Sequence, residues 1–323
     1  MSTEKDLQKI VDDYICEKRA VGHKYIKNEK MLRRLYNLHR QQGYSGPVLP
    51  KDFVLTYIEK TSYEQETNRF HRISTIRGLA EYMLRMGYSA YLFPHRMVPY
   101  PVNTYVPHIF SDKELAEIFI QADQYPSTSA TPFRTIQYSL LFRLLYGSGL
   151  RISEALSLKK KDVDLASGII YIQSSKFEKK RNLPLANSLT ERFRVYVKNI
   201  QRDSIWQKSE YFFPSSSGNK YSEGAIYSVF RDLLRRSGIS HGGRGKGPRL
   251  HDLRHTYAVH CLRNWVREGK NLTVALPYLS VYMGHVGPRS TQYYLRLTSE
   301  LYPDIVFTLD RSYEWIIPGV INP

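Results

Sequence analysis

The sequence is short of cysteine, with only Cys16 and Cys261 among its 323 residues. Two thiols this far apart do not suggest the disulfide framework of a small secreted domain, and they are too few for a zinc site built on thiolates. We therefore expect two reduced thiols and no metal centre of this kind.

Long apolar runs are also missing. No stretch of 18 apolar residues occurs, which argues against a transmembrane helix. The first ten residues, MSTEKDLQKI, have neither the basic start nor the apolar core of a signal peptide. We expect a soluble, cytoplasmic protein that has no membrane partner.

Acidic residues are outnumbered, since 30 Asp and Glu stand against 47 Lys and Arg and leave a net charge of +17. Such an excess attracts a polyanion. Nucleic acid is the first candidate, and an acidic membrane surface is the other.

The length and the apolar pattern predict two domains. Between residues 3 and 92, apolar residues recur at helical spacing in four segments, which indicates a small helical bundle. Four prolines in residues 94–108 indicate an extended linker. We place a helical domain at 1–95, the linker at 96–108, a second domain at 109–299 and a tail at 300–323. The polar faces of the bundle fit either a phosphate-facing or a merely solvated surface; their basic residues are Lys24, Lys27, Lys30, Arg33, Arg34, Arg69, Arg72, Arg77 and Arg85.

The second domain mixes helices with short strands. Ser111 and Glu114 have the spacing of a capping box that opens a helix. The segments GIIYIQS and RNLPL predict two strands around the charged KFEKKR, a hairpin with a basic tip, and YFFPSSSGNK predicts a further strand and turn. The expected fold class is mainly α with a small β-sheet.

Residues 249–260, RLHDLRHTYAVH, place His251, Arg254 and His255 at positions i, i+3 and i+4, which share one helix face. An enzyme that breaks a phosphodiester without a metal must neutralise the transition state, supply a nucleophile and protonate the leaving oxygen. Arginine forks suit the first task and a tyrosine suits the second. Because the chain has 26 tyrosines, composition alone selects none of them.

Three segments together resemble the blocks of the tyrosine recombinase, or phage integrase, family, and they occur in the family's order. They are GSGLRISEALSL at 147–158, HDLRHTYA at 251–258 and MGHVGPRSTQYY at 283–294. Each block alone is unspecific, but their ordered coincidence with a tyrosine nine residues after His285 is specific. The resemblance spans about 110–295 by motif. Residues 1–95 carry none of these motifs and resemble the family only in their helical character. The resemblance implies that they form a helical DNA-clamping domain before a mixed α/β catalytic domain.

The resemblance implies six catalytic residues, which are Arg151, Lys176, His251, Arg254, His285 and Tyr294. The two arginines and two histidines are implied to converge on the scissile phosphate, and the lysine is implied to protonate the leaving 5′ oxygen. The tyrosine is implied to be the nucleophile. Glu154 is implied to orient the first arginine, and His255 to play a supporting role.

Some of these assignments have neighbouring alternatives. Lys179 and Lys180 lie on the same predicted hairpin as Lys176, and such a basic tip also fits a DNA-contacting or solvated loop. Tyr293 adjoins Tyr294, although the spacing from His285 favours Tyr294. Tyr282 precedes the third block and is expected to be a core residue.

The resemblance also implies an activity and its partners. Enzymes of this family clamp double-stranded DNA, assemble as homotetramers on it and form a 3′-phosphotyrosyl link, with neither a cofactor nor a metal. Accessory recombinases or DNA-bending proteins are further conceivable partners. The tail with its apolar Trp315, Ile316 and Ile317 is expected to dock on a neighbouring protomer or to pack in cis. Integration or transposition of a mobile element is the favoured role, while resolution of chromosome dimers and promoter inversion use the same chemistry.

Three other hypotheses compete with recombination. A type IB topoisomerase would use the same residues to relax supercoils as a monomer, and a DNA-binding regulator would keep the scaffold without catalysis. A metal site would use His251, Asp252 and His255, because histidines at i and i+4 can share a metal ion. Arg254 within that motif would repel the cation, and no second acidic cluster stands out in the sequence.

Overall fold

The computed structural model describes residues 6–94, 105–173, 180–243 and 246–285, together with Thr291 and Tyr294. By contacts between its residues the chain divides into two compact units, 1–104 and 105–323, which we describe separately. The expectations for Lys176, Lys179, Tyr293 and the tail at 300–323 fall outside the described residues. No described helix is both long enough and apolar enough to cross a bilayer.

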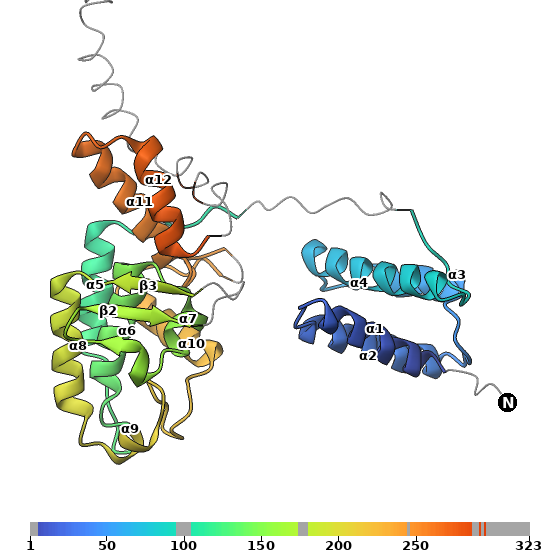
Figure 1. The fold of residues 1–323 in the computed structure, drawn as a ribbon, viewed down its shortest axis with the longest axis horizontal. Coiled ribbons are helices and arrows are strands. Elements are labelled where there is room, and N and C mark those ends of the chain that lie inside the picture. Colours follow the sequence, from blue (N-terminus) through green and yellow to red (C-terminus); the bar gives the residue numbers. More distant parts are fainter. Residues whose placement is uncertain are drawn as a thin grey trace, which may run out of the picture. The chain divides into compact units, whose positions relative to one another are not determined.

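The first unit contains the four predicted helices (Figure 1): α1 Leu7–Ala20, α2 Ile26–Gln41, α3 Lys51–Ile58 and α4 Glu66–Arg85. The apolar stripe predicted on the first helix is buried, from Leu7 through Ile15. It packs with the inner faces of the other three helices in one hydrophobic core. This burial is the reason that the 3.6-residue period identified the helices correctly.

Charges on the bundle surface fall into two groups. Five of the basic residues that the sequence placed there pair with nearby carboxylates: Arg33, Arg69, Arg72, Arg77 and Arg85. By contrast, Lys27, Lys30 and Arg34 are exposed on α2 and have no ion-pair partner among the described acidic residues. Their spacing of three and four residues places them on one helix face.

The second unit is built around a buried helix and a small sheet (Figure 1). Its elements, in order, are α5 Asp112–Asp123, α6 Arg134–Ser148, α7 Ile152–Leu156, the 3₁₀ turn η1 Lys160–Asp162, β1 Val163–Asp164, β2 Ile169–Ile172, β3 Arg181–Pro184, α8 Asn187–Ile200, α9 Ser204–Lys208, α10 Glu223–Arg236, α11 Asp252–Arg267 and α12 Leu272–Met283. The α6 helix packs against α5, α8 and α11, so apolar residues surround it on several sides. The predicted fold class, mainly α with a small β-sheet, is confirmed.

Local predictions in this unit are largely confirmed. The Ser111 hydroxyl accepts the Glu114 amide hydrogen while the Glu114 carboxylate accepts the Ser111 amide hydrogen, so the capping box is present. The strands β2 and β3 pair antiparallel as the predicted hairpin, with Ile172 opposite Arg181 and Ile169 opposite Pro184. The strand β1 pairs with β2 and completes the order β1-β2-β3.

The strand predicted within YFFPSSSGNK is wrong. Tyr211 and Pro214 each form only an isolated bridge, to Lys159 and Lys220. Phe212 and Phe213 are both buried, which differs from the alternation of a strand that has one solvated face. Aromatic packing on both sides of the chain therefore imitated a strand signal in the sequence.

Candidate active site

The Gly-Ser-Gly turn places Arg151. The helix α6 ends at Ser148, and Gly149 adopts a left-handed conformation with φ of 59°. A β-carbon at this glycine would lie 2.6 Å from Cδ1 of Tyr257, so a larger residue would clash as well as strain the backbone. The chain then re-enters a helix with Arg151 as the N-cap of α7.

Glu154 anchors this arginine from within the protein. Its side chain is 1% exposed and accepts a hydrogen bond of 3.0 Å from Nη1 of Arg151. Arg181 donates to the same carboxylate from both Nη atoms, at 3.1 and 2.8 Å. Burial alone would raise the pKa of Glu154, but the hydrogen bonds and charges of Arg181 and Arg151 outweigh it and lower that pKa. The direct contact between Glu154 and Arg151 supports the orienting role expected for Glu154.

Arg254 is almost fully buried, with an exposed fraction of 2%. Its two Nη atoms donate to the carbonyls of Gly149 and Met283, at 2.5 and 2.8 Å. Burial is the main cause that lowers its pKa, to about 10, so the guanidinium remains charged at neutral pH. One side chain therefore joins the C-terminal ends of two helices, α6 and α12.

Three arginines meet at the end of α12. Nε of Arg181 donates to the Tyr282 carbonyl at 2.9 Å, Arg254 donates to the Met283 carbonyl, and Nη2 of Arg151 donates to the Gly284 carbonyl at 3.1 Å. The last carbonyls of a helix lack partners within the helix and carry its partial negative charge. Cations from three distant segments therefore satisfy one helix terminus, and this gathers them next to His285.

His251 and His285 lie at the ends of two helices, α11 and α12. His251 is the N-cap of α11, and its ring centroid is 4.8 Å from that of His255. His285 follows Gly284, and its Nδ1 lies 2.8 Å from the Thr291 hydroxyl oxygen. Burial and then the charges of Arg254, Arg151 and Arg181 lower the pKa of His285 to about 4. Burial, His255 and the arginines lower the pKa of His251 as well, so both rings are neutral at pH 7.

Tyr294 joins this group. Its exposed fraction is 3%, and its ring stacks with that of His285 at a centroid distance of 5.9 Å and an interplanar angle of 27°. The ring of His255 lies 5.5 Å away. The structure therefore brings together Tyr294, His285 and the arginines around Gly284. Tyr282 is part-buried and stacks on Tyr257, which agrees with the core role expected for it.

Two residues that contact the predicted site were missed in the sequence. Arg181 shares Glu154 with Arg151, and Thr291 contacts His285. In the sequence Arg181 is one of several basic residues in KFEKKR, so nothing marked it apart from its neighbours. Thr291 lies inside the third block, and its position between His285 and Tyr294 was the only available signal.

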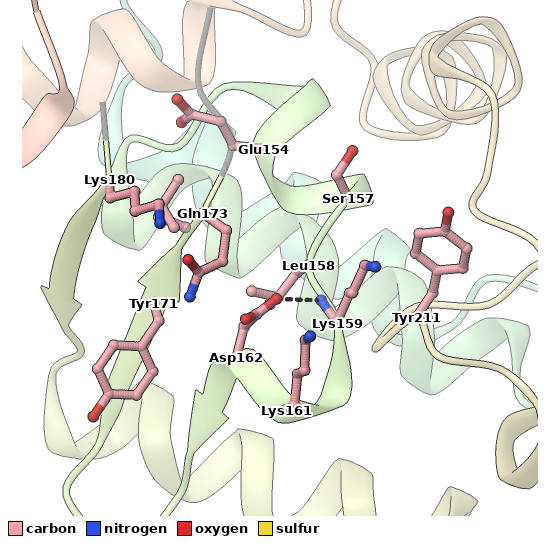
Figure 2. A pocket seen from close by; sticks show the side chains of 11 residues that line it. Glu154, Ser157, Leu158, Lys159, Lys161, Asp162, Tyr171, Gln173, Lys180 and Tyr211 are labelled. Carbon is pink, nitrogen blue, oxygen red and sulfur yellow. Dashed lines mark hydrogen bonds between the residues drawn. The ribbon is translucent and has the colours of Figure 1, made fainter. Parts of the chain in front are cut away.

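A basic hollow of about 650 Å³ adjoins Glu154, between α7 and the sheet (Figure 2). Lys159, Lys161 and Lys180 line it, and the Asp162 carboxylate accepts the Lys159 amide hydrogen at 3.2 Å. No group of three His, Cys, Asp or Glu side chains within the described ranges is placed to hold a metal ion. The ammonium groups of Lys161 and Lys180 suit an anionic ligand, whereas that of Lys159 pairs with the Glu210 carboxylate at 2.8 Å.

Known proteins that are similar to this chain include tyrosine recombinases and integrases. The chain is 29% identical over 306 residues to the "Putative integrase/recombinase y4rB" of Sinorhizobium fredii, covering 94% of this chain and 97% of that protein. It is 27% identical over 305 residues to the tyrosine recombinase XerC of Halalkalibacterium halodurans, covering 90% and 92%.

Among solved structures, the post-cleavage complex of the XerH site-specific recombinase with palindromic difH substrate matches with a TM-score of 0.64. The match covers 96% of this chain and 85% of that one at 17% identity, and so it concerns the fold alone. The phage integrase family model matches residues 112–300, which span the arginines, the histidines and Tyr294. The chain therefore belongs to the phage integrase family of tyrosine recombinases, enzymes that cleave and rejoin DNA.

Proposed function

We propose that this chain is a site-specific DNA recombinase that uses Arg151, Lys176, His251, Arg254, His285 and Tyr294 as its catalytic residues. The observation that carries the proposal is the convergence at the end of α12, where Arg151 and Arg254 bind adjacent carbonyls and the ring of Tyr294 stacks on His285. Glu154 orients Arg151, and His255 supports Tyr294, because their ring centroids lie 5.5 Å apart.

The charge of the cluster suits a phosphoryl transition state. Arg151 and Arg181 pair with Glu154 while Arg254 binds carbonyls nearby, so three guanidiniums and one carboxylate leave a net charge of two positive units at the site. A phosphorane formed from a phosphodiester carries two negative charges, and guanidiniums held in advance stabilise it without reorganisation. The arginines thereby supply the neutralisation for which other phosphoryl-transfer enzymes use Mg²⁺.

In the first step the Tyr294 oxygen attacks the scissile phosphorus, a 3′-phosphotyrosyl bond forms and the bond to the 5′ oxygen breaks. The phenolic proton leaves as the new bond forms. The imidazoles beside Tyr294 are uncharged at neutral pH because their pKa values are lowered, so a ring nitrogen can accept this proton. Lys176 protonates the departing 5′ oxygen. In the second step a 5′ hydroxyl from the partner duplex attacks the phosphotyrosine and restores the phenol.

A covalent adduct tests the chemistry. We would incubate the protein with nicked duplexes from the ends of its own locus, in excess chelator, and separate products on a denaturing gel. The expected result is a protein linked to a 3′ end, formed by wild type and by Tyr293→Phe but not by Tyr294→Phe. Loss in Tyr293→Phe with retention in Tyr294→Phe would assign the nucleophile to the other tyrosine.

The rival functions give different results in the same assay. A topoisomerase would relax supercoiled DNA without joining two sites. A regulator would bind DNA with a strong salt dependence and form no adduct with any duplex. Loss of the adduct in chelator, with recovery on adding a divalent cation, would favour a metal-dependent mechanism.

We also propose that double-stranded DNA contacts two basic surfaces of the chain, with residues 1–95 as the clamping domain and 109–299 as the catalytic domain. The first surface is the α2 face of Lys27, Lys30 and Arg34, which are exposed and unpaired with described acids. The second is the lysine-lined hollow beside Glu154. Arginines on α4 are less suited, because they already pair with carboxylates.

Salt-dependent binding measures these contacts. Lys30→Glu and Arg34→Glu should weaken binding to all duplexes and lower the slope of log affinity against log salt by roughly one for each lost phosphate contact. Lys60→Glu is the matched control, because Lys60 pairs with Glu66 in the same unit. An unchanged slope in both α2 variants would remove this face from the interface.

Assembly is the third part of the proposal. We propose that the tail at 300–323 docks on a neighbouring protomer in a homotetramer on DNA. Its apolar Trp315, Ile316 and Ile317 match an apolar groove of about 540 Å³ on the catalytic unit, where Tyr278 and Val281 are 72% and 71% exposed. The groove is lined by Asn182, Tyr257, Trp265, Pro277, Tyr278, Leu279, Val281 and Tyr282.

Truncation separates docking in trans from packing in cis. A chain ending at Leu301 should still form the adduct on a single site but should fail to assemble tetramers and to join two sites. Val281→Glu in the full chain should reproduce that loss if the groove receives the tail. Intact assembly after truncation would refute docking in trans, and loss of folding in the isolated monomer would indicate packing in cis.

The cellular role we favour is integration or transposition of a mobile element, in the cytoplasm. The similarity to y4rB over nearly the full length of both chains supports an integrase role. Recombination between the two ends of the chain's own locus, seen as a circular junction by amplification, would support it. Action only at a chromosomal site, or only with an added accessory recombinase or DNA-bending protein, would favour a resolution role.

A further inference from the structure

Arg181 is tied into the site although no catalytic role has been assigned to it. Its side chain is 7% exposed, and its Nε and both Nη atoms are engaged within the protein. The two Nη atoms grip the Glu154 carboxylate in a bidentate pair, which is the strongest form of this interaction. Unlike Arg254, Arg181 has its Nε engaged as well as both Nη atoms, so we assign it an effect on the reaction that passes through its partners.

Those partners come from two segments, and Arg181 itself lies on a third. Glu154 belongs to α7 and holds Arg151, while the Tyr282 carbonyl belongs to α12, three residues before His285. Arg181 itself begins β3 opposite Ile172, at the base of the hairpin whose sequence includes Lys176. One guanidinium thus links the segments that carry Arg151, His285 and Lys176.

The turn before His285 is shaped around this side chain. Gly284 has a φ of 68°, and a β-carbon there would lie 2.7 Å from Nη1 and 2.8 Å from Cζ of Arg181. Because glycine has no side chain, the Arg181 guanidinium can lie directly against the backbone of this turn. This close approach is independent of the ion pair and points to the same residue.

We propose that Arg181 is a positioning residue. It keeps Glu154 ionised and, through Glu154, fixes the position of the Arg151 side chain relative to the Gly284-His285 turn. The proposal rests on the proposed role of Arg151 at the scissile phosphate. Without Arg181, a carboxylate that is 1% exposed would have one guanidinium instead of two. Glu154 would then take up a proton more readily, and a neutral Glu154 would hold Arg151 more weakly.

This predicts a pH dependence that simple loss of packing would not produce. Other charged groups face or adjoin Glu154, and they are present in both wild type and variant: Arg151, Arg254, Lys159, Lys161, Asp162 and Lys180. Arg181 also lowers the pKa of His285, so its removal changes two titrations, and Glu154→Gln in the same background isolates the part that belongs to Glu154.

The experiment compares single-turnover adduct formation by wild type, Arg181→Gln and Arg181→Lys on a nicked duplex between about pH 5.5 and 8.5, with DNA affinity measured in parallel. Arg181→Gln should cleave about 10–100-fold more slowly at the acid end and recover part of that loss at the alkaline end, because small misplacements of a positioning group cost up to this factor. DNA affinity should change by less than about threefold, and Arg181→Lys should restore part of the rate. Arg194→Gln is the matched control, an arginine of the same unit that pairs with Glu191 on the surface.

A second measurement does not need activity. The melting temperature of Arg181→Gln should lie furthest below that of wild type near pH 7 and should approach it as the pH drops toward about 5, because proton uptake by Glu154 in the folded variant offsets part of the lost ion pair; Glu154→Gln in the same background should remove most of this pH dependence. A difference that stays constant with pH, or a cleavage rate equal to wild type at every pH, would overturn the proposal. If wild type forms no Tyr294 adduct while the pH-dependent melting holds, the proposed function fails and the positioning role fails with it, but the Arg181–Glu154 coupling stands.

Discussion

Replacing Gly149 with alanine should destabilise the catalytic unit and impair cleavage together. This glycine has a φ of 59°, and alanine in the left-handed region costs about 1–2 kcal/mol. The new methyl would lie 2.6 Å from Cδ1 and 3.1 Å from Cε1 of Tyr257. That ring packs on Tyr282, so displacing it adds an overpacking cost of about 1–3 kcal/mol.

The unfolded chain offsets part of this loss, because alanine has fewer unfolded conformations than glycine by about 0.4–1 kcal/mol. The net expectation is a loss of about 2–4 kcal/mol, measured by urea unfolding of the two proteins. Cleavage should fall further than the unfolded fraction explains, since the Gly149 carbonyl accepts a hydrogen bond from Arg254.

Gly147 is the matched control, two residues away in the same Gly-Ser-Gly turn. It lies inside α6, and a β-carbon there meets only Cδ2 of Leu189, at 3.4 Å. Gly147→Ala should therefore be neutral or stabilising by up to about 1 kcal/mol, from helix propensity. If Gly149→Ala stays within about 0.5 kcal/mol of wild type, a spread typical of neutral surface changes, the reasoning from φ and the Tyr257 contact is refuted.

Three further outcomes are expected. Ser111→Ala should cost about 1 kcal/mol in urea unfolding because it removes a capping box, and Ser111→Asp should retain most of the stability. Asp252→Asn should cost about 1–3 kcal/mol, since this fully buried carboxylate accepts hydrogen bonds from the Arg249 amide and the Tyr105 hydroxyl; an unchanged melting temperature would contradict it. Because the pKa of His285 is lowered to about 4, the unfolded chain binds this proton first, so stability should fall as the pH drops from about 6.5 toward 4. Melts at several pH values should show a smaller fall in His285→Gln.

The sequence predicted helices and caps correctly because the interactions that determine them act between residues a few positions apart. The stripe from Leu7 to Ile15 follows the helical period, and the Ser111-Glu114 pair is a contact over three residues. The aromatic pair Phe212-Phe213 misled the strand prediction, because a segment buried on both sides and a strand share the same apolar composition. Only the surrounding packing distinguishes the two.

Within the site, the ordered blocks in the sequence were enough to nominate Arg151, Arg254, His285 and Tyr294, and to determine the family. The sequence could not separate the arginines that we propose contact phosphate from those that contact only the protein. Arg181 is one basic residue among several in its hairpin, and its importance lies in a carboxylate 27 positions earlier and a carbonyl 101 positions later.

What the sequence determined by itself was therefore the local structure and the order of the chemical groups, because periodicity, capping and motif spacing all act over a few residues. The tertiary structure alone decided that three guanidiniums meet at the carbonyls of residues 282–284 beside a neutral His285. The physical reason is that a helix terminus, a buried carboxylate and a desolvated imidazole acquire their electrostatic properties only when distant segments exclude water around them.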